Sequence, residues 1–351
     1  MASRVQIPAA AAAALLAAAL FGASTPLAKL LLGHVAPTLL AGLLYLGSGL
    51  GLTVLRLVRD RGWRSPGIAP REWLWLAAAI LFGGVAGPLL LLTALVRMPA
   101  TTASLLLNLE GVFTALLAWL VFREGADRRI VLGMGLIVAG GALLAWPDDW
   151  SLHGTTGAAL VAAACFAWAI DNNLTRKVSA SDALFIAGLK GWTAGLVAIA
   201  IAVWRGADAP TAGIIGGAML VGFLGYGASL VLFVVALRGL GSARTGAYFS
   251  TAPFIGAALA IAIFHDPTTA GFWAAATCMA AGVWLHLTEH HEHQHTHELL
   301  THAHAHRHDL HHRHEHDFPW DGSEPHTHPH RHEPVTHTHA HFPDTHHRHK
   351  H

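Results

Sequence analysis

The chain has 351 residues, of which 53% are hydrophobic and only 12% are charged. A soluble domain carries about 25% charged residues, so most of this chain is not built to face water. The formal net charge of +1 gives no reason to expect a nucleic-acid partner. Long apolar runs fill residues 1–288 and are almost absent from residues 289–351. We therefore expect a membrane region followed by a polar tail.

The apolar runs have the length of membrane-spanning helices. A bilayer core needs about 20 apolar residues per helix, and helices satisfy their own backbone groups in lipid. The first run begins like a secretory signal, but it continues to Leu32, which is too long for one. The sequence predicts an all-α integral membrane protein with about ten transmembrane helices. They are expected near residues 9–32, 37–58, 73–95, 99–122, 129–146, 154–175, 182–204, 212–236, 243–264 and 268–288.

The positions of Lys and Arg predict how these helices are oriented. Cytoplasmic loops carry an excess of both residues. If the N-terminus is cytoplasmic, the opposite loops hold only Arg97 and Arg205, and nearly all other Lys and Arg residues of the loops lie inside. An even number of spans returns the chain to the same side. We expect a multi-pass protein of a bacterial-type inner (plasma) membrane with both termini in the cytoplasm.

The membrane region repeats itself. A shift of 142 residues places Phe122 on Phe264 and Glu124 on Asp266, and a shift of 147 places Phe21 on Trp168. The sequence therefore predicts three parts, 1–147, 148–288 and the tail 289–351, with five helices in each of the first two. An odd number of helices inverts the second repeat relative to the first. Inverted repeats place a substrate site near the membrane midplane, between the halves.

The stretch from Ala94 to Trp146 carries a family resemblance. It has a Leu/Pro/Ala step, a Leu-rich helix with Glu110, the charged end Arg123-Glu124 and then a Gly-rich helix. In this it resembles the EamA-type members of the drug/metabolite transporter superfamily over residues 9–288. The chain departs from the pattern at Gly111, where Pro is usual, and at Ala252, where the second repeat would carry Glu. The resemblance implies ten helices in two repeats and transport of small molecules, most often outward.

Ionisable side chains inside spans are costly and mark candidate sites. A carboxyl group removed from water takes up a proton more readily, so Glu110 is a candidate for proton exchange. Asp171 and Lys190 either line the site or form a structural pair, and Lys29 can reach the membrane interface. The candidate substrate-binding residues are Asn108, Glu110, Asp171, Asn172, Lys190, Tyr226 and Tyr248.

The tail is a histidine-rich segment with an internal duplication. It holds 24 of the 28 histidines, mostly as His-X-His and His-His, and a shift of 35 residues superposes Thr301 to Asp309 on Thr336 to Asp344. Neutral imidazole binds nickel, zinc, cobalt and copper. With few apolar residues the tail cannot build a core, so we expect it to be disordered without metal. The alternative roles are solubility and a response to acid pH.

The expected metal ligands are the histidines of these motifs. They are His302, His304, His306, His308, His311, His312, His314, His326, His328, His330, His332, His337, His339, His341, His346, His347 and His349.

Two transport functions fit this pattern. The first is a secondary transporter that exports a small metabolite and carries a metal-binding regulatory tail. Lys190 favours a substrate with an anionic group, since it would repel a cation. The second is an exporter of nickel, cobalt or zinc whose tail collects the ion. No phosphate-binding loop or catalytic motif is present in the sequence, so an enzyme is not expected, no cofactor is required, and transport draws on a gradient. The expected partners are a small-molecule substrate, lipid and metal ions.

Overall fold

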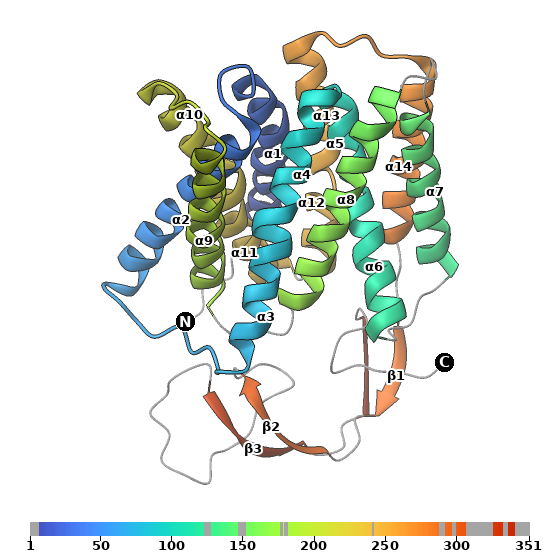
Figure 1. Cartoon of the computed structure of the whole chain (residues 1–351). Helices are drawn as coiled ribbons and strands as arrows, with labels where there is room; N and C mark the ends of the chain where they lie inside the picture. The colour runs from blue at the N-terminus through green and yellow to red at the C-terminus, as the bar shows by residue number, and fades with distance from the viewer. Residues whose placement is uncertain are drawn as a thin grey trace.

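The computed structural model describes most of the helical region and four short stretches of the tail. The described residues are 7–122, 128–146, 152–175, 178, 182–240, 242–287, 292–296, 300–306, 326–332 and 336–340. In Figure 1 the helices form one bundle, and the tail strands lie beyond the end of α14. We call the side where α3 begins and α14 ends the tail side, and the opposite side the far side.

The first half of the bundle has five spans, two of them interrupted. Its elements are α1 (Ile7–Leu31), α2 (Pro37–Asp60), α3 (Glu72–Ala79), the π-helical segment η1 (Ile80–Ala86), α4 (Gly87–Arg97), α5 (Ala100–Leu106), α6 (Leu109–Phe122) and α7 (Arg128–Ala145). α3, η1 and α4 form one continuous span, and α5 and α6 form another.

The second half follows the same plan. Its elements are α8 (Leu152–Thr175), α9 (Ala183–Trp204), α10 (Ala212–Gly222), the π-helical segment η3 (Phe223–Ala228), α11 (Ser229–Leu240), α12 (Ser242–Phe249), α13 (Ala252–Phe264) and α14 (Ala270–Leu287). Over the described residues, nine helical runs are long and apolar enough to cross a membrane, and α14 supplies a shorter apolar helix. The predicted fold class, an all-α integral membrane protein, is confirmed.

Local sequence explains where several helices begin and end. Pro37 occupies the first turn of α2, where its missing N–H is not needed. Arg61 and His265 end α2 and α13 with φ of 54°, the left-handed conformation that closes many helices. The Asp182 carboxylate accepts a hydrogen bond from the backbone N–H of Leu184 and so caps α9.

The interruptions fall at equivalent places in the two halves. A shift of 142 residues places Ile80, the start of η1, on Gly222, next to the start of η3. The same shift places Asn108, in the break between α5 and α6, on Ser250, in the break between α12 and α13. The sequence predicted the spans but not these breaks. They free backbone groups in the bundle interior, which is tolerated where protein surrounds them.

The packing of the helices repeats as well. α2 packs along α9, and α7 packs along α14, so each helix contacts its own equivalent. α1 packs on α11 just as α8 packs on α4. Glycines permit the closest approach: a Cβ on Gly191 would lie 2.5 Å from the Cα of Gly49. Small residues at helix contacts are the usual means of tight packing in membranes.

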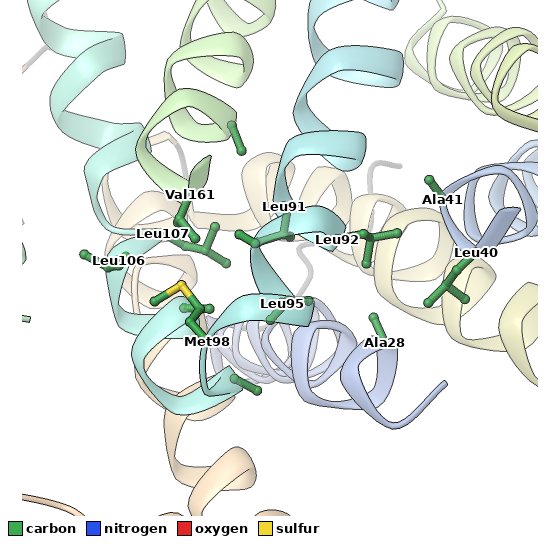
Figure 2. Packing of buried hydrophobic residues seen from close by; sticks show 14 of the residues in the cluster. Ala28, Leu40, Ala41, Leu91, Leu92, Leu95, Met98, Leu106, Leu107 and Val161 are labelled. Carbon is green, nitrogen blue, oxygen red and sulfur yellow. The ribbon is translucent and has the colours of Figure 1, made fainter. Parts of the chain in front are cut away.

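The largest apolar core lies between helices of both halves. Leu91, Leu92 and Leu95 of α4 are buried there, against residues such as Leu40 of α2 and Val161 of α8 (Figure 2). Lipid is as apolar as these side chains, so close packing rather than exclusion of water stabilises this region. It fixes α4 and α8 relative to each other and thereby positions the polar groups further along α8.

The described parts of the tail form strands. β1 (Glu292–Thr296) pairs with β4 (Thr336–Ala340), and β2 (Leu300–His306) pairs with β3 (His326–His332), both antiparallel. The disorder expected of the metal-free tail stays a prediction. The sequence of these stretches alternates His with small or polar residues, and a period of two is the repeat of a strand. A low apolar content predicts the absence of a core but does not prevent local pairing.

Candidate functional site: a polar cluster at α6, α8 and α9

An ion pair joins α8 to α9 inside the membrane region. Lys190 Nζ lies 2.5 Å from Oδ1 of Asp171 and 3.1 Å from Oγ1 of Thr175. Thr175 donates its own hydrogen bond to the same Asp171 oxygen at 2.8 Å. The side chains of Lys190 and Asp171 are only 17% and 12% exposed. The two charges cancel, so Lys190 does not present an uncompensated positive charge to a substrate.

A second polar contact lies on the next residue of α8. Asn172 donates from Nδ2 to Oε1 of Glu110 at 2.9 Å and to Oγ1 of Thr114 at 3.3 Å. Glu110 is the second residue of α6, just after the break at residues 107–108, and thus lies near the middle of its span. Among the described residues, no Lys, Arg or His forms an ion pair with Glu110. Its charge is therefore open to compensation by a proton or a substrate.

The π-helical segment η1 supports this cluster. The backbone carbonyl of Gly83 accepts hydrogen bonds from Tyr45 Oη at 2.9 Å and from Trp168 Nε1 at 3.0 Å. A π-helical segment shifts the backbone hydrogen bonds and commonly marks a functional site. A methyl group at Gly83 would collide with the carboxylate of Asp171. The glycine thus lets η1 lie directly against the ion pair.

Sequence reasoning missed two of these supporting residues. Tyr45 and Trp168 were not among the candidates, although both carry a polar group inside an apolar span. The rarity of Tyr in this chain, with three in all, was the signal that could have identified Tyr45.

The remaining predicted site residues lie apart from the ion pair. Asn108 is buried and donates to the carbonyl of Leu105 at the helix break. The Tyr226 ring packs on Tyr45, with centroids 5.5 Å apart. Tyr248 lies on α12, and its carbonyl accepts a hydrogen bond from Thr251. Of the seven candidates, Glu110, Asp171, Asn172 and Lys190 are brought together, and Tyr226 joins them through Tyr45.

Contacts on the far side link the two halves. Thr101 Oγ1 of α5 donates to Oδ2 of Asp266, beyond α13, at 2.7 Å. α5 also packs along α13, whereas among the described residues the equivalent pair, α12 and α6, is not in comparable contact. Lys29 donates to the carbonyls of Leu95 and Met98 at the end of α4, which is a structural role at the end of its span. Thr101, Asp266 and the packing of α5 on α13 therefore join the two halves on the far side.

A different set of charges joins α2 to α9 on the tail side. Arg56 is buried, and its Nε donates to Oδ2 of Asp182 at 3.0 Å. Arg59 binds the same carboxylate and also Asp60. Burial favours a higher pKa for Asp182, but hydrogen bonds from Arg59 and Arg56 outweigh it and hold the pKa below its usual value. Trp63 packs 5.1 Å from the Arg56 guanidinium.

The helical region offers no cluster typical of a metal site. Among the side chains that the structure describes, all before residue 286, no three His, Cys, Asp or Glu residues come together in a way that could hold an ion. The predicted metal ligands His302, His304 and His306 lie on β2, four more lie on β3, and His337 and His339 lie on β4. The other predicted ligands fall outside the described residues: His308, His311, His312, His314, His341, His346, His347 and His349.

Comparison with known proteins places this architecture. The chain is 31% identical over 263 residues to an uncharacterized transporter of Methanothermobacter thermautotrophicus, covering 70% of this chain and 77% of that one. It is 41% identical over 110 residues to a probable 4-amino-4-deoxy-L-arabinose-phosphoundecaprenol flippase subunit ArnE of Pseudomonas paraeruginosa, covering 31% of this chain and 91% of that one.

A protein of known crystal structure has the same fold, with a TM-score of 0.60 at 19% identity over 78% of this chain and 95% of the other. The model of the EamA-like transporter family matches twice, over residues 8–146 and 155–288, one match to each half. The resemblance seen in the sequence is thus confirmed, and the chain belongs to the EamA-like transporter family.

Proposed function

We propose that this membrane transporter exports a small organic metabolite through the polar cluster at α6, α8 and α9. The observation that carries the proposal is the charged group Glu110, without an ion-pair partner among the described residues, beside the Asp171–Lys190 pair. Charged groups inside a membrane bundle are retained where they serve a pathway. The duplicated fold supports alternating access, in which one repeat moves against the other around a central site.

The unequal contacts of the two halves support the direction of movement. α5 packs on α13 on the far side, and the equivalent contact on the tail side is not formed to a comparable degree. Exchange of these two equivalent contacts would close the tail side and open the far side. With both termini in the cytoplasm, as the Lys and Arg pattern predicts, this exchange would change access to the cluster from the cytoplasmic to the external side, which is the direction of export.

Glu110 is the group we assign to coupling and to recognition. The sequence pointed to an anionic substrate because of Lys190, but the ion pair with Asp171 removes most of that reason. A substrate with an amino or hydroxyl group would instead bind the Glu110 carboxylate and the Asn172 amide. The ArnE relatives are named for a molecule with such an amino group. A proton would occupy Glu110 when the substrate leaves.

The tail is assigned a metal-binding, regulatory role. Its 24 histidines supply the donors that transition metals prefer. They also favour a second candidate function, in which nickel, cobalt or zinc is the exported ion and the tail raises its concentration at the cytoplasmic mouth. The lack of a ligand cluster among the described side chains of the bundle favours the organic substrate.

Uptake into inverted membrane vesicles tests the proposal. A panel of labelled amino acids, amines and sugars is compared with nickel, cobalt and zinc, for the wild type and for Glu110→Gln. The control is Asp208→Asn, which removes an exposed carboxylate from a loop. We expect uptake of an organic compound that Glu110→Gln lowers at least tenfold and Asp208→Asn leaves intact. Metal uptake without organic uptake would overturn the first choice in favour of the second.

A further inference from the structure

Histidines occupy directly opposite positions in the paired strands of the tail. Between β1 and β4 the register places His293 opposite His339 and His295 opposite His337. Between β2 and β3 the opposite pairs are His302 with His330, His304 with His328, and His306 with His326. We call each such pair of opposite histidines a rung. The five rungs thus bring together ten histidines from different parts of the tail.

The rungs of each sheet share one face. Successive residues of a strand alternate between the two faces, so positions two apart lie on the same one. His302, His304 and His306 therefore share a face with their partners on β3. The residues between them, such as Ala303 opposite Pro329, belong to the other face, which carries no histidine in either sheet. The pairing thus sorts the histidines onto a single side.

The spacing within such a face suits a metal ion. Directly opposite Cβ atoms in an antiparallel pair lie about 4.5–5.5 Å apart. Positions two apart on one strand are separated by about 6.6 Å. An ion bound by imidazole nitrogens at about 2 Å needs ligands from positions separated by that order of distance. Two successive rungs therefore offer four imidazoles to one ion.

We propose that each of the two tail sheets binds a divalent transition-metal ion between successive histidine rungs, across the paired strands. Four nitrogen donors fit tetrahedral zinc and square-planar nickel or copper, and they exclude magnesium and calcium, which prefer oxygen. The proposal rests on the metal-binding role proposed for the tail, and it assigns that role to particular rungs. It adds His293 and His295, which the sequence motifs alone did not single out.

Metal binding at particular rungs can be distinguished from metal binding that depends only on the number of histidines in the tail. If the tail binds metal only because it is rich in histidine, removing any three histidines has the same effect. If the rungs bind metal, removing three from β2 breaks every rung of its sheet. Removing His311, His312 and His314, which lie outside the described strands, leaves every rung of those strands intact. The two variants lose the same number of imidazoles and so form a matched pair.

Metal titration of the full-length protein in detergent distinguishes these cases. Zinc and nickel are each titrated by calorimetry against the wild type, the variant with His302, His304 and His306 changed to Gln, and the matched variant of His311, His312 and His314. We expect the β2 variant to lose one of the tightest sites or weaken it at least tenfold, and the matched variant to keep it. Equal losses in both would overturn the rungs while leaving the tail a metal binder.

Absence of tight binding in the wild type would overturn the proposed role of the tail together with the rungs.

Double variants provide the second measurement. His304→Gln and His328→Gln lie on one rung, so each alone removes the same ion and their effects on affinity should not add. His304→Gln and His337→Gln belong to different sheets, and their effects should add. Additive effects within a rung would contradict the shared site.

Discussion

The two halves of the bundle share one plan but not one chemistry. Both have five spans, a π-helical segment in the third and a break in the fourth. Where the first half has Glu110, the second has Ala252, by the shift of 142 residues. Where the second has Asp171, the first has Ser24, by the shift of 147 residues, and Ser24 donates a hydrogen bond to the carbonyl of Phe21 on its own helix.

This difference separates the requirements of the fold from those of the site. Close helix packing needs small residues at repeated positions, and both halves supply them. Charge in a membrane is costly, so it is kept only where it is used. By the shift of 147 residues, Thr25 and Leu43 stand where the second half has Asn172 and Lys190. The charged residues of the cluster at α6, α8 and α9 are therefore not duplicated in the other repeat.

The largest expected effect is in the membrane orientation of the two halves, because a reporter fusion lies either in the cytoplasm or outside the cell. Residue 66 lies in the loop after α2, and residue 208 lies in the equivalent loop after α9. We expect reporter fusions at 66 and 289 to read cytoplasmic and fusions at 149 and 208 to read external. The same reading at 66 and 208 would contradict the inverted repeat.

Removing one partner of the ion pair is expected to have the next largest effect. Asp171→Ala leaves Lys190 as an unpaired charge in the bundle, which costs on the order of 3–5 kcal/mol. We expect little folded protein by size-exclusion profile and thermal melting. The double variant Asp171→Asn and Lys190→Met removes both charges and should recover folding.

Transport by that double variant determines the role of the pair. If the pair only stabilises the contact between α8 and α9, transport should return with folding. If it lines the substrate path, the double variant should fold and remain inactive in vesicles. We expect the second result, because the pair lies next to Glu110 and Asn172 on α8.

A glycine comparison has a smaller expected effect. Gly83→Ala forces a methyl group against the Asp171 carboxylate, and overpacking costs about 1–3 kcal/mol. Gly111→Ala is the matched control, since a Cβ there meets nothing within 4 Å. In a helix that change stabilises by about 0.5–1 kcal/mol. Thermal melting should show a loss for the first variant and none for the second; equal losses would argue against a special role for η1.

The positions of the helices and the charged residues within them could be predicted from the sequence. Over the described residues, length and hydropathy located the nine candidate spans and the shorter helix α14 to within a few residues, because the bilayer thickness fixes helix length. Charged residues in spans identified Glu110, Asp171 and Lys190, because such residues are rare there. The pairing of Asp171 with Lys190 remained one of two alternatives. The register of helices is set by packing, which periodicity in a uniformly apolar helix does not reveal.

The residues that support the site, Tyr45 and Trp168, could not be predicted from the sequence for the same reason. Tyr45 and Trp168 both donate hydrogen bonds to the carbonyl of Gly83 because η1 departs from regular helix. No residue pattern predicts a π-helical segment. In the tail, the composition predicted that no hydrophobic core forms. The strand register depends on pairing between distant residues, which composition does not reveal. The cross-strand histidine rungs follow from that register rather than from the His-X-His motif.

The smallest expected effect concerns Asp182, which joins α2 to α9 on the tail side. Because its pKa is held below the ordinary value by Arg59 and Arg56, its ionised form stabilises the folded state. That contribution is complete above the unfolded pKa of about 3.9 and is lost as the pH falls further, through the lowered folded pKa. Between pH 7 and 5 we therefore expect no loss from this group.

Asp182→Asn tests this contribution. It should lower stability by about 1–2 kcal/mol at pH 7, because the buried Arg56 loses its charged partner and retains only Asp60, at 3.8 Å. The partial exposure of the carboxylate and of Arg59 keeps the effect small. The difference in melting temperature from wild type should be constant between pH 7 and 5 and shrink below pH 4, as Asp182 takes up a proton first in the unfolded state and, at lower pH, in the folded state. Asp208→Asn, with the same change of charge in an exposed loop, should show no difference at any of these pH values. A difference between Asp182→Asn and wild type that shrinks already between pH 7 and 5 would contradict the lowered pKa and the assignment of Asp182 as the ionised partner of Arg56.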